Sequence, residues 1–260
     1  MKFSAAPKFR TIFYVLIPLL ILLNGISTAS AKGKWEQIAK AQGITVFQKE
    51  VPGRSLPVFR GVGIVKENIF DVLAVLYDVP ARVDWVHQCT ASDVLKEYNE
   101  LDRMVYNRTA APWPISDRDV VVRTKVHIDR ETMTVRVTFK TDTHASAPKV
   151  EDVVRMGRLT GYYEIKALSR GHTRVTYEVD ADPGGYLPAW LVKMASKDLP
   201  LKTILNLKKR VKKDRLNKSY EAFHKRWRIP ENENYPEDAK ADQTRKTSKL
   251  ETAAPNSAAD

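Results

Sequence analysis

The chain has 260 residues, of which 43% are hydrophobic and 28% charged, and its formal net charge is +12. This composition excludes collagen-like, wholly disordered and polytopic membrane proteins, while the single cysteine excludes an internal disulfide and a cysteine-based zinc finger. The length allows one sizeable buried core, and the excess of positive charge suits an anionic membrane surface or a nucleic acid as a partner.

The first 31 residues predict a secretory signal peptide that is cleaved after Ala31. Lys2, Lys8 and Arg10 precede an apolar stretch over residues 12–23, and small residues follow up to the cleavage site. The apolar stretch is shorter than the roughly 20 residues that a membrane-spanning helix needs, and an uncleaved anchor is the alternative. We therefore expect an exported protein, periplasmic or secreted, and export argues against a nucleic acid as its partner.

The exported chain divides into one domain over residues 32–230 and a polar tail over residues 231–260. No linker or repeat interrupts the domain, which also carries the excess of positive charge. The tail is rich in Glu, Asn, Lys, Ala and Thr and has almost no apolar periodicity, so it cannot bury enough surface to offset chain entropy. We predict that the tail is disordered.

The predicted elements begin with a short helix over 35–41, strands over 44–50 and 58–65, and helices over 67–77 and 80–85. Alternating side chains then predict strands over 92–99, 102–109, 119–129, 132–141, 158–168 and 173–181. A long helix is expected over 188–227, beginning at Pro188 and bent at Pro200. Strands and helices that are segregated in this way predict an α+β fold, in which the last helix covers one face of an antiparallel sheet.

The long helix changes character along its length. Its first half and the strands carry many large apolar and aromatic side chains, which suit either a filled core or the wall of an apolar pocket. Between Lys202 and Arg228 there are eleven Lys and Arg residues against two acids, with a loose apolar stripe between them. Such a helix suits transient contact with an anionic membrane, or it is a solvated surface. The candidates for membrane docking are Lys208, Lys209, Arg210, Lys212 and Lys213.

Three stretches resemble the START domains, the lipid-transfer domains related to steroidogenic acute regulatory protein. Residues 112–122, Pro-Trp-Pro-Ile-Ser-Asp-Arg-Asp-Val-Val-Val, are similar to the family's signature of a proline and Ser/Asn-Arg-Asp before a strand. Residues 82–85, Arg-Val-Asp-Trp, resemble its Arg-x-x-Trp-Asp region, and residues 182–192 resemble the segment that opens its C-terminal helix. The resemblance covers about residues 35–215.

The resemblance implies a helix-grip fold, a curved antiparallel sheet wrapped around the long C-terminal helix. It also implies an internal tunnel for one lipid (a sterol, phospholipid or fatty acyl lipid), gated by that helix and a loop over about 142–152. Arg123 and Arg155 are candidates to meet a polar lipid group, because neither has an evident acidic partner in the sequence; surface exposure is the alternative. The tunnel candidates are Trp85, Tyr106, Trp113, Arg123, Met133, Phe139, Arg155, Tyr162, Tyr177, Trp190, Leu191, Met194, Leu201, Ile204 and Leu205.

Evidence for catalysis is weak in the sequence. The five histidines lack metal-ligand spacing, and there is no G-x-S-x-G elbow or phosphate-binding glycine loop. Cys89 is interpreted as a small buried side chain rather than a nucleophile. We expect a non-enzymatic lipid-binding and lipid-transfer protein without metal or cofactor. The alternative is a helix-grip cyclase or hydrolase that uses His127 or Tyr106 for proton transfer on a small hydrophobic substrate.

Overall fold

The computed structural model describes residues 33–54, 56–147, 150–185 and 187–214, together with residue 235. The predicted signal peptide, the predicted helical residues after 214 and almost all of the predicted tail lie outside these residues. The helices are α1 (Ile69–Tyr77), the 3₁₀-helix η1 (Pro80–Asp84) and α2 (Ala189–Asp214). The strands are β1 (Glu36–Ala41), β2 (Ile44–Lys49), β3 (Val58–Val65), β4 (Cys89–Asn99), β5 (Asp102–Thr109), β6 (Arg118–Asp129), β7 (Thr134–Thr141), β8 (Val154–Arg155), β9 (Arg158–Ser169) and β10 (His172–Asp182).

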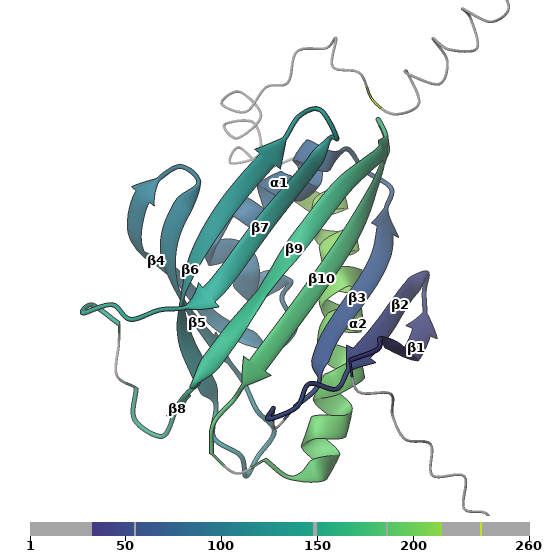
Figure 1. Cartoon of the computed structure of the whole chain (residues 1–260). Helices are drawn as coiled ribbons and strands as arrows, with labels where there is room; N and C mark the ends of the chain where they lie inside the picture. Colours follow the sequence, from purple (N-terminus) through teal and green to yellow (C-terminus); the bar gives the residue numbers. More distant parts are fainter. Residues whose placement is uncertain (1–32, 55, 148–149, 186, 215–234, 236–260) are drawn as a thin grey trace, which may run out of the picture. The chain divides into compact units, whose positions relative to one another are not determined.

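The strands form one open sheet in the order β1-β2-β3-β10-β9-β7-β6-β5-β4. Neighbours along this path are antiparallel, and the short β8, which the sequence did not predict, pairs in parallel with β6. Both α1 and α2 lie on the same face of the sheet, which curves around them (Figure 1). The predicted α+β helix-grip fold is therefore confirmed.

The predicted helix over residues 35–41 is wrong. These residues form β1, which pairs with β2 through the two-residue turn Gln42-Gly43. Both turn residues have positive φ, 50° and 69°, as the favoured hairpin turns require. Gly43, which the sequence suggested as the end of a helix, therefore supplies the backbone conformation that reverses the chain.

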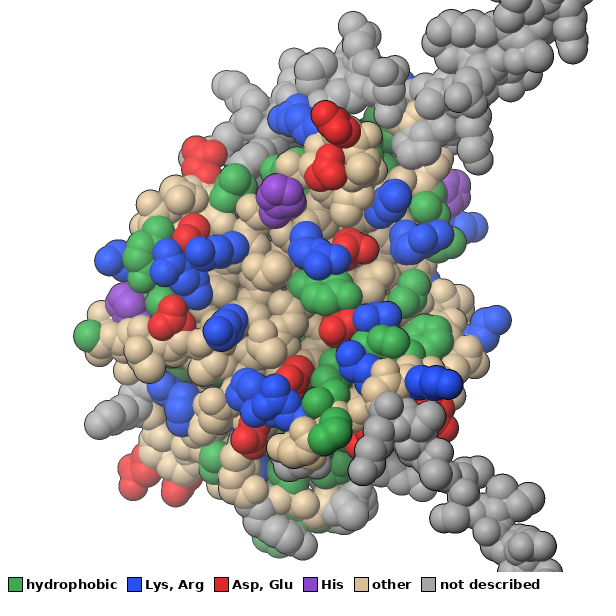
Figure 2. All heavy atoms as spheres, viewed as in Figure 1, with side chains coloured by type: hydrophobic (Ala, Val, Ile, Leu, Met, Phe, Trp, Pro, Cys, Tyr) green, Lys and Arg blue, Asp and Glu red, His purple; other side chains and the backbone are tan. Residues whose placement is uncertain are grey.

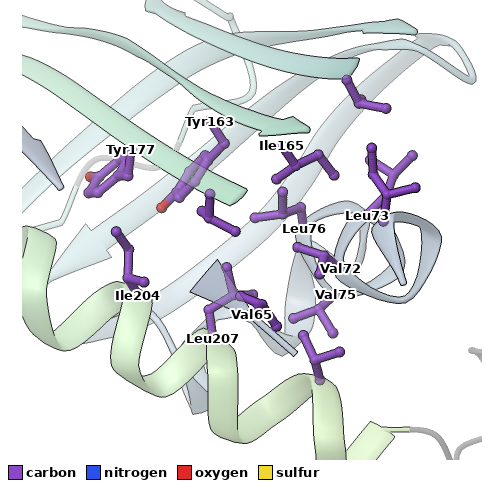
Figure 3. Packing of buried hydrophobic residues seen from close by; sticks show 14 of the residues in the cluster. Val65, Val72, Leu73, Val75, Leu76, Tyr163, Ile165, Tyr177, Ile204 and Leu207 are labelled. Carbon is purple, nitrogen blue, oxygen red and sulfur yellow. The ribbon is translucent and has the colours of Figure 1, made fainter. Parts of the chain in front are cut away.

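The main core fills the space between the inner face of the sheet and the two helices. Strand residues such as Ile165 and helix residues such as Leu73 and Leu207 are at most 2% exposed, and they converge in this layer (Figure 3). α2 lies close to β3 because Gly61 faces it: a Cβ atom there would be 2.8 Å from Cδ1 of Ile204. The missing side chain thus sets how near the helix comes to the sheet.

The outer face of the sheet is charged. Lys and Arg side chains alternate there with Asp and Glu (Figure 2). Arg60 on β3 donates to Glu178 on β10 with an Nε···Oε2 distance of 2.8 Å, and Arg136 on β7 pairs with Glu164 on β9. Opposite charges on neighbouring strands stabilise the sheet modestly and keep this face in water. Among the described residues, no helix is long and apolar enough to span a bilayer.

Tyr235, in the predicted disordered tail, is buried in the main core, with 5% of its surface exposed. Its hydroxyl accepts a 2.7 Å hydrogen bond from Nδ2 of Asn68, the residue that caps the start of α1. The guanidinium of Arg170, at the turn between β9 and β10, lies 4.9 Å from the ring centroid. One point of the tail is therefore packed against the domain, which its polar composition did not indicate.

We predict that Tyr235→Ala lowers the free energy of unfolding by about 3 kcal/mol, because it removes a buried aromatic ring and leaves Asn68 without this partner. Tyr235→Phe keeps the ring and should cost only about 1 kcal/mol. Urea unfolding of the two variants and the wild type measures both changes. If Tyr235→Ala is as stable as the wild type, the ring does not contribute to the core in solution.

Candidate ligand-binding cavity

A cavity of about 300 Å³ lies between the inner face of the sheet and the first half of α2. Residues of seven strands, β3, β4, β5, β6, β7, β9 and β10, line it together with the segment between η1 and β4. Most are apolar, for example Val122, Leu159 and Leu199. Its volume lies at the lower end of the range that small-molecule sites occupy. The structure thus contains an apolar pocket where the resemblance implies a tunnel.

Three aromatic rings form one wall of the cavity. Tyr163 on β9 and Tyr177 on β10 are stacked, with ring centroids 4.4 Å apart, and Phe139 on β7 lies 6.1 and 6.4 Å from them (Figure 3 shows the two tyrosines). Burial raises the pKa of Tyr177 to about 12 and that of Tyr163 well above its usual value. Both tyrosines are therefore neutral hydrogen-bonding groups at physiological pH.

Arg82, from η1, places a positive charge beside these rings. Burial lowers the pKa of its guanidinium, which interacts electrostatically with Tyr163, Tyr177 and Cys89, all in the cavity wall. Arg82 keeps part of its accessible surface because it lines the cavity. Its Nη2 donates a long 3.4 Å hydrogen bond to the carbonyl of Leu76, and no carboxylate among the described residues pairs with it. An arginine remains protonated here, so its charge faces the cavity.

Two further polar atoms near the cavity have no hydrogen-bond partner among the described residues. They are the hydroxyl of Thr124, which lines the cavity, and the indole Nε1 of Trp85, whose ring meets that of Tyr163 edge-on at 6.3 Å. Buried donors without partners are rare in folded proteins, and each is a place where a ligand or water can bind.

Two connecting segments line one end of the cavity, which we interpret as its mouth. The β5–β6 loop contributes Ala110 to Pro112, and the β10–α2 connection contributes Pro183 and Leu187. Arg118, which is 7% exposed, bridges the two segments, because it donates to the carbonyls of Ser116 and Gly184. Asp117 holds the β5–β6 loop in place through Arg108 (2.7 Å) and the amide of Ala111 (3.1 Å). The mouth of the cavity is therefore held by a preformed polar frame.

The remaining charged groups in the cavity wall are at the rim. Asp198 and Lys202, one turn apart on α2, form an ion pair of 2.9 Å. Burial lowers the pKa of His87, so this ring is neutral at pH 7. Within the part of the chain that the structure describes, no group of three or more His, Cys, Asp or Glu residues could hold a metal ion.

Of the predicted tunnel residues, the structure places Phe139 and Tyr177 in the cavity wall. Five others pack in the main core without lining the cavity: Trp85, Met133, Leu201, Ile204 and Leu205. The backbone of Trp190, Leu191 and Met194 belongs to the start of α2, but their side chains lie outside those described.

Four predicted residues lie on the outer face of the sheet. Tyr106 donates a 3.1 Å hydrogen bond to Asp119, and Tyr162 donates one of 2.9 Å to Glu178. Arg155 pairs with Asp119 (2.6 Å) and Arg123 with Asp102 (2.8 Å), each through two nitrogens. The expectation that both arginines lack an acidic partner is wrong, because the partners are supplied by neighbouring strands. The Arg155–Asp119 pair links β8 to β6, and the Arg123–Asp102 pair links β6 to β5.

Trp113 is 91% exposed and does not line the cavity, although its neighbour Pro112 does. The loop over 142–152, which the resemblance implies as a gate, packs in its described part on the outer face, where Ala147 contacts the cluster of Met104, Tyr106 and Val121. The residues that line the cavity at its mouth are instead Ala110, Ala111, Pro112, Pro183 and Leu187.

Sequence reasoning missed several cavity residues, of which Arg82, Tyr163 and Arg118 are the most consequential. Arg82 and Arg118 belong to two of the three stretches that carry the START resemblance, so their positions were visible in the sequence. The sequence did not show the direction of their side chains: Arg82 enters the cavity wall from the short helix η1, and Arg118 enters it from the first residue of β6.

The predicted docking residues divide into two groups. Lys209, Lys212 and Lys213 are exposed near the C-terminal end of α2. Arg210 pairs with Asp84 at 2.7 Å, and Nζ of Lys208 donates to the carbonyl of Gln42 at 3.4 Å. Lys213 is eleven residues beyond Lys202 at the cavity rim, about 16 Å along the helix axis. The exposed lysines are therefore well separated from the mouth.

The family model described as START domain matches residues 27–216. The chain belongs to the START domain family. This START domain is 27% identical over 189 residues to an uncharacterized protein of Pseudomonas aeruginosa, a match that covers 73% of this chain and 92% of that protein. It is 26% identical over 171 residues to the phosphatidylcholine transfer protein of Bos taurus, covering 63% of this chain and 78% of that protein.

Solved structures agree with this assignment. A STAR-related lipid transfer protein fragment from Xanthomonas axonopodis matches with a TM-score of 0.62 and 29% identity, over 68% of this chain and 98% of that one. Human StAR-related lipid transfer protein 5 has the same TM-score at 22% identity, over 73% of this chain and 90% of that one, which supports the fold alone. The START fold and the family relationship support a lipid-binding role for this chain.

Proposed function

We propose that this START domain is a non-enzymatic carrier that holds one lipid in the cavity and moves it between membranes. The observation that carries the proposal is an apolar cavity of about 300 Å³ whose wall includes Arg82, an arginine that pairs with no carboxylate among the described residues. Apolar walls favour acyl or sterol carbon by about 25 cal/mol per Å² of buried surface. Arg82 and the two tyrosine hydroxyls offer hydrogen bonds to the polar end of such a ligand.

The test is native mass spectrometry of the protein, with lipid extraction of the same sample. We expect one bound lipid per protein molecule, and the extracted lipid identifies the ligand class. A protein that is empty, and that takes up no phospholipid, fatty acid or sterol from vesicles, contradicts the proposal. Turnover of a hydrophobic substrate, lost when Tyr163 or His87 is changed, would favour the enzyme alternative instead.

We propose that the protein acts outside the cytoplasm. The support is the basic start, apolar stretch and small residues that end at Ala31. The mass of the protein purified from its own cell tests this, because export predicts a chain that begins at residue 32.

We propose that the carrier meets the membrane with the mouth of its cavity. Trp113 projects from the loop beside the mouth, and tryptophan favours the interface between water and lipid. Because the polar frame around Asp117 already fixes the loop, little conformational entropy is lost when Trp113 enters the bilayer. Lys209, Lys212 and Lys213 lie near the C-terminal end of α2, whereas the mouth lies beside its start, so they attract an anionic surface without marking the point of contact.

We predict that Trp113→Ser weakens binding to anionic vesicles about tenfold at both low and high salt, because it removes an apolar contact. Reversing Lys209, Lys212 and Lys213 to Glu should weaken binding and slow lipid transfer at low salt only, because salt screens exposed charges. Vesicle sedimentation at 0.05 and 0.5 M salt separates the two effects.

Neither change touches the cavity wall, so both variants should retain full lipid content by mass spectrometry. Transfer that is unaffected by the lysine reversals would contradict the electrostatic part of this proposal. Vesicle binding that is unaffected by Trp113→Ser would contradict the insertion of the loop.

A further inference from the structure

The size of the cavity limits how much lipid it can hold. An engineered apolar cavity of about 150 Å³ in another protein binds benzene, which corresponds to roughly 25 Å³ per carbon atom. At this packing, the cavity of about 300 Å³ has room for about twelve carbon atoms. The roughly 30 chain carbons of a common phospholipid, or the roughly 27 carbons of a sterol, would need more than about twice this space.

The far end of the cavity is closed by packed side chains. The main core includes the tyrosine pair of the cavity wall, and Ile165, Ile204 and Leu207 are fully buried in it (Figure 3). Thr124 and Val137 in the wall also line a second pocket, whose volume of about 20 Å³ holds about one water molecule. Within the described part of the chain, an acyl chain that enters at the mouth therefore meets a filled core.

Contacts on both sides of the cavity oppose its widening. At Pro200, α2 lies close to β3, because a Cβ atom at Gly61 would be 3.0 Å from Cβ of Pro200. Farther along the same helix, Arg210 pairs with Asp84 of η1 at 2.7 Å. On the other side, antiparallel pairing joins β6, β7, β9 and β10. Room for a second acyl chain would require α2 to move away from the sheet, which would break these helix contacts.

We infer that the cavity holds a lipid with a single acyl chain of about twelve carbon atoms, such as a medium-length fatty acid or its monoacyl ester. The inference rests on the proposed lipid-binding function and specifies its ligand class by the number and length of the chains. Lipids with two chains, and sterols, are excluded by their volume.

The first experiment offers the protein vesicles of phosphatidylcholine that contain equal minor shares of fatty acid, monoacylglycerol, diacylglycerol and cholesterol. All acyl chains have the same length of about twelve carbons. The monoacylglycerol and the diacylglycerol differ only in the number of chains, so the head group does not decide between them. Native mass spectrometry counts the bound lipids. We expect single-chain lipids to be enriched at least tenfold over two-chain lipids and cholesterol, relative to their shares in the vesicles.

The second experiment measures the preferred chain length with a series of saturated fatty acids offered at equal concentrations. Leu159 lines the cavity, and Leu159→Ala should lengthen the preferred chain by about three carbons, because it removes about three carbon atoms from the wall. Leu205→Ala is the matched control. It removes the same atoms from a partly buried leucine that packs against the core without lining the cavity, so the preferred length should stay unchanged.

Equal or preferential binding of a two-chain lipid or of cholesterol overturns the inference and leaves the lipid carrier intact. A preferred length that does not change in a folded Leu159→Ala variant also overturns it, because the chain then does not lie in this cavity. If Leu159→Ala does not fold, the lipids bound by the wild type still decide the inference. No bound lipid of any kind overturns the proposed function itself.

Discussion

Gly161→Ala is expected to lower the free energy of unfolding by about 3 kcal/mol and the melting temperature by about 6–12 °C. A Cβ atom at residue 161 would overlap the carbonyl oxygen of Glu178 on the neighbouring strand and would lie 2.7 Å from Cζ of Phe139. The backbone oxygen cannot move without shifting β10, so the strain cannot be relieved by a side-chain rotation. Thermal unfolding by circular dichroism measures the effect.

Gly171→Ala is the matched control, because nothing lies within 4 Å of a Cβ atom there and the residue has no positive φ. It should change stability by less than about 0.5 kcal/mol. Equal melting temperatures for the two variants would show that β9 and β10 are not packed as closely as the structure indicates. Gly161 also leaves the space in which the ring of Phe139 lies, so the same variant should alter the cavity wall.

Ala181→Phe is expected to reduce the amount of bound lipid at least tenfold without lowering the melting temperature. Ala181 lies on the inner face of β10 and lines the cavity. A phenyl ring there occupies space that the ligand would take, and filling a cavity restores contacts to the side chains around it. Lipid content by native mass spectrometry and thermal unfolding are measured on the same preparation.

Thr176→Phe places the same ring on the outer face of β10 and serves as the control. It should leave the lipid content unchanged, since Thr176 does not line the cavity. Full lipid occupancy in Ala181→Phe would show that the ligand binds elsewhere. Reduced occupancy in both variants would indicate a general loss of folding, which the melting temperatures would reveal.

Most strands could be predicted because their side chains alternate. β3 and β5 have the predicted bounds, and α1 differs by two residues at its start. β1 could not be predicted from its own pattern, because its strand conformation depends on pairing with β2 across a turn of two residues with positive φ. Local sequence does not contain that pairing.

It was harder to predict which side chains of each strand face inward than to predict where the strands lie in the sequence. Tyr162 and Tyr163 are adjacent, so one must face inward and the other outward, and the sequence does not say which. The structure turns Tyr163 into the cavity and Tyr162 toward Glu178. Tyr106 is 4% exposed although it faces outward, because the chain around Ala147 covers it. A prediction of the inward face depends on the contrast between apolar and polar side chains along the strand. Where both faces are buried, this contrast is absent.

The cavity itself follows from the relation between distant segments. Arg82 comes from a 3₁₀-helix, the tyrosine pair from a hairpin and the mouth from two loops, and their convergence is a property of the fold. The sequence indicated which residue types could line a pocket, but a filled core and an empty one have the same periodicity.

The two ends of the sheet have irregular registers. β4 slips against β5 at three places, and β1 slips against β2 between Gln37 and Ala39. A second sheet can add to an exposed edge only where backbone donors and acceptors form an even row. The interruptions twist and break that row at both edges. The sheet can therefore remain open, with one face free to hold α2 and the cavity. Its irregular edges keep separate molecules from pairing edge to edge into a fibre.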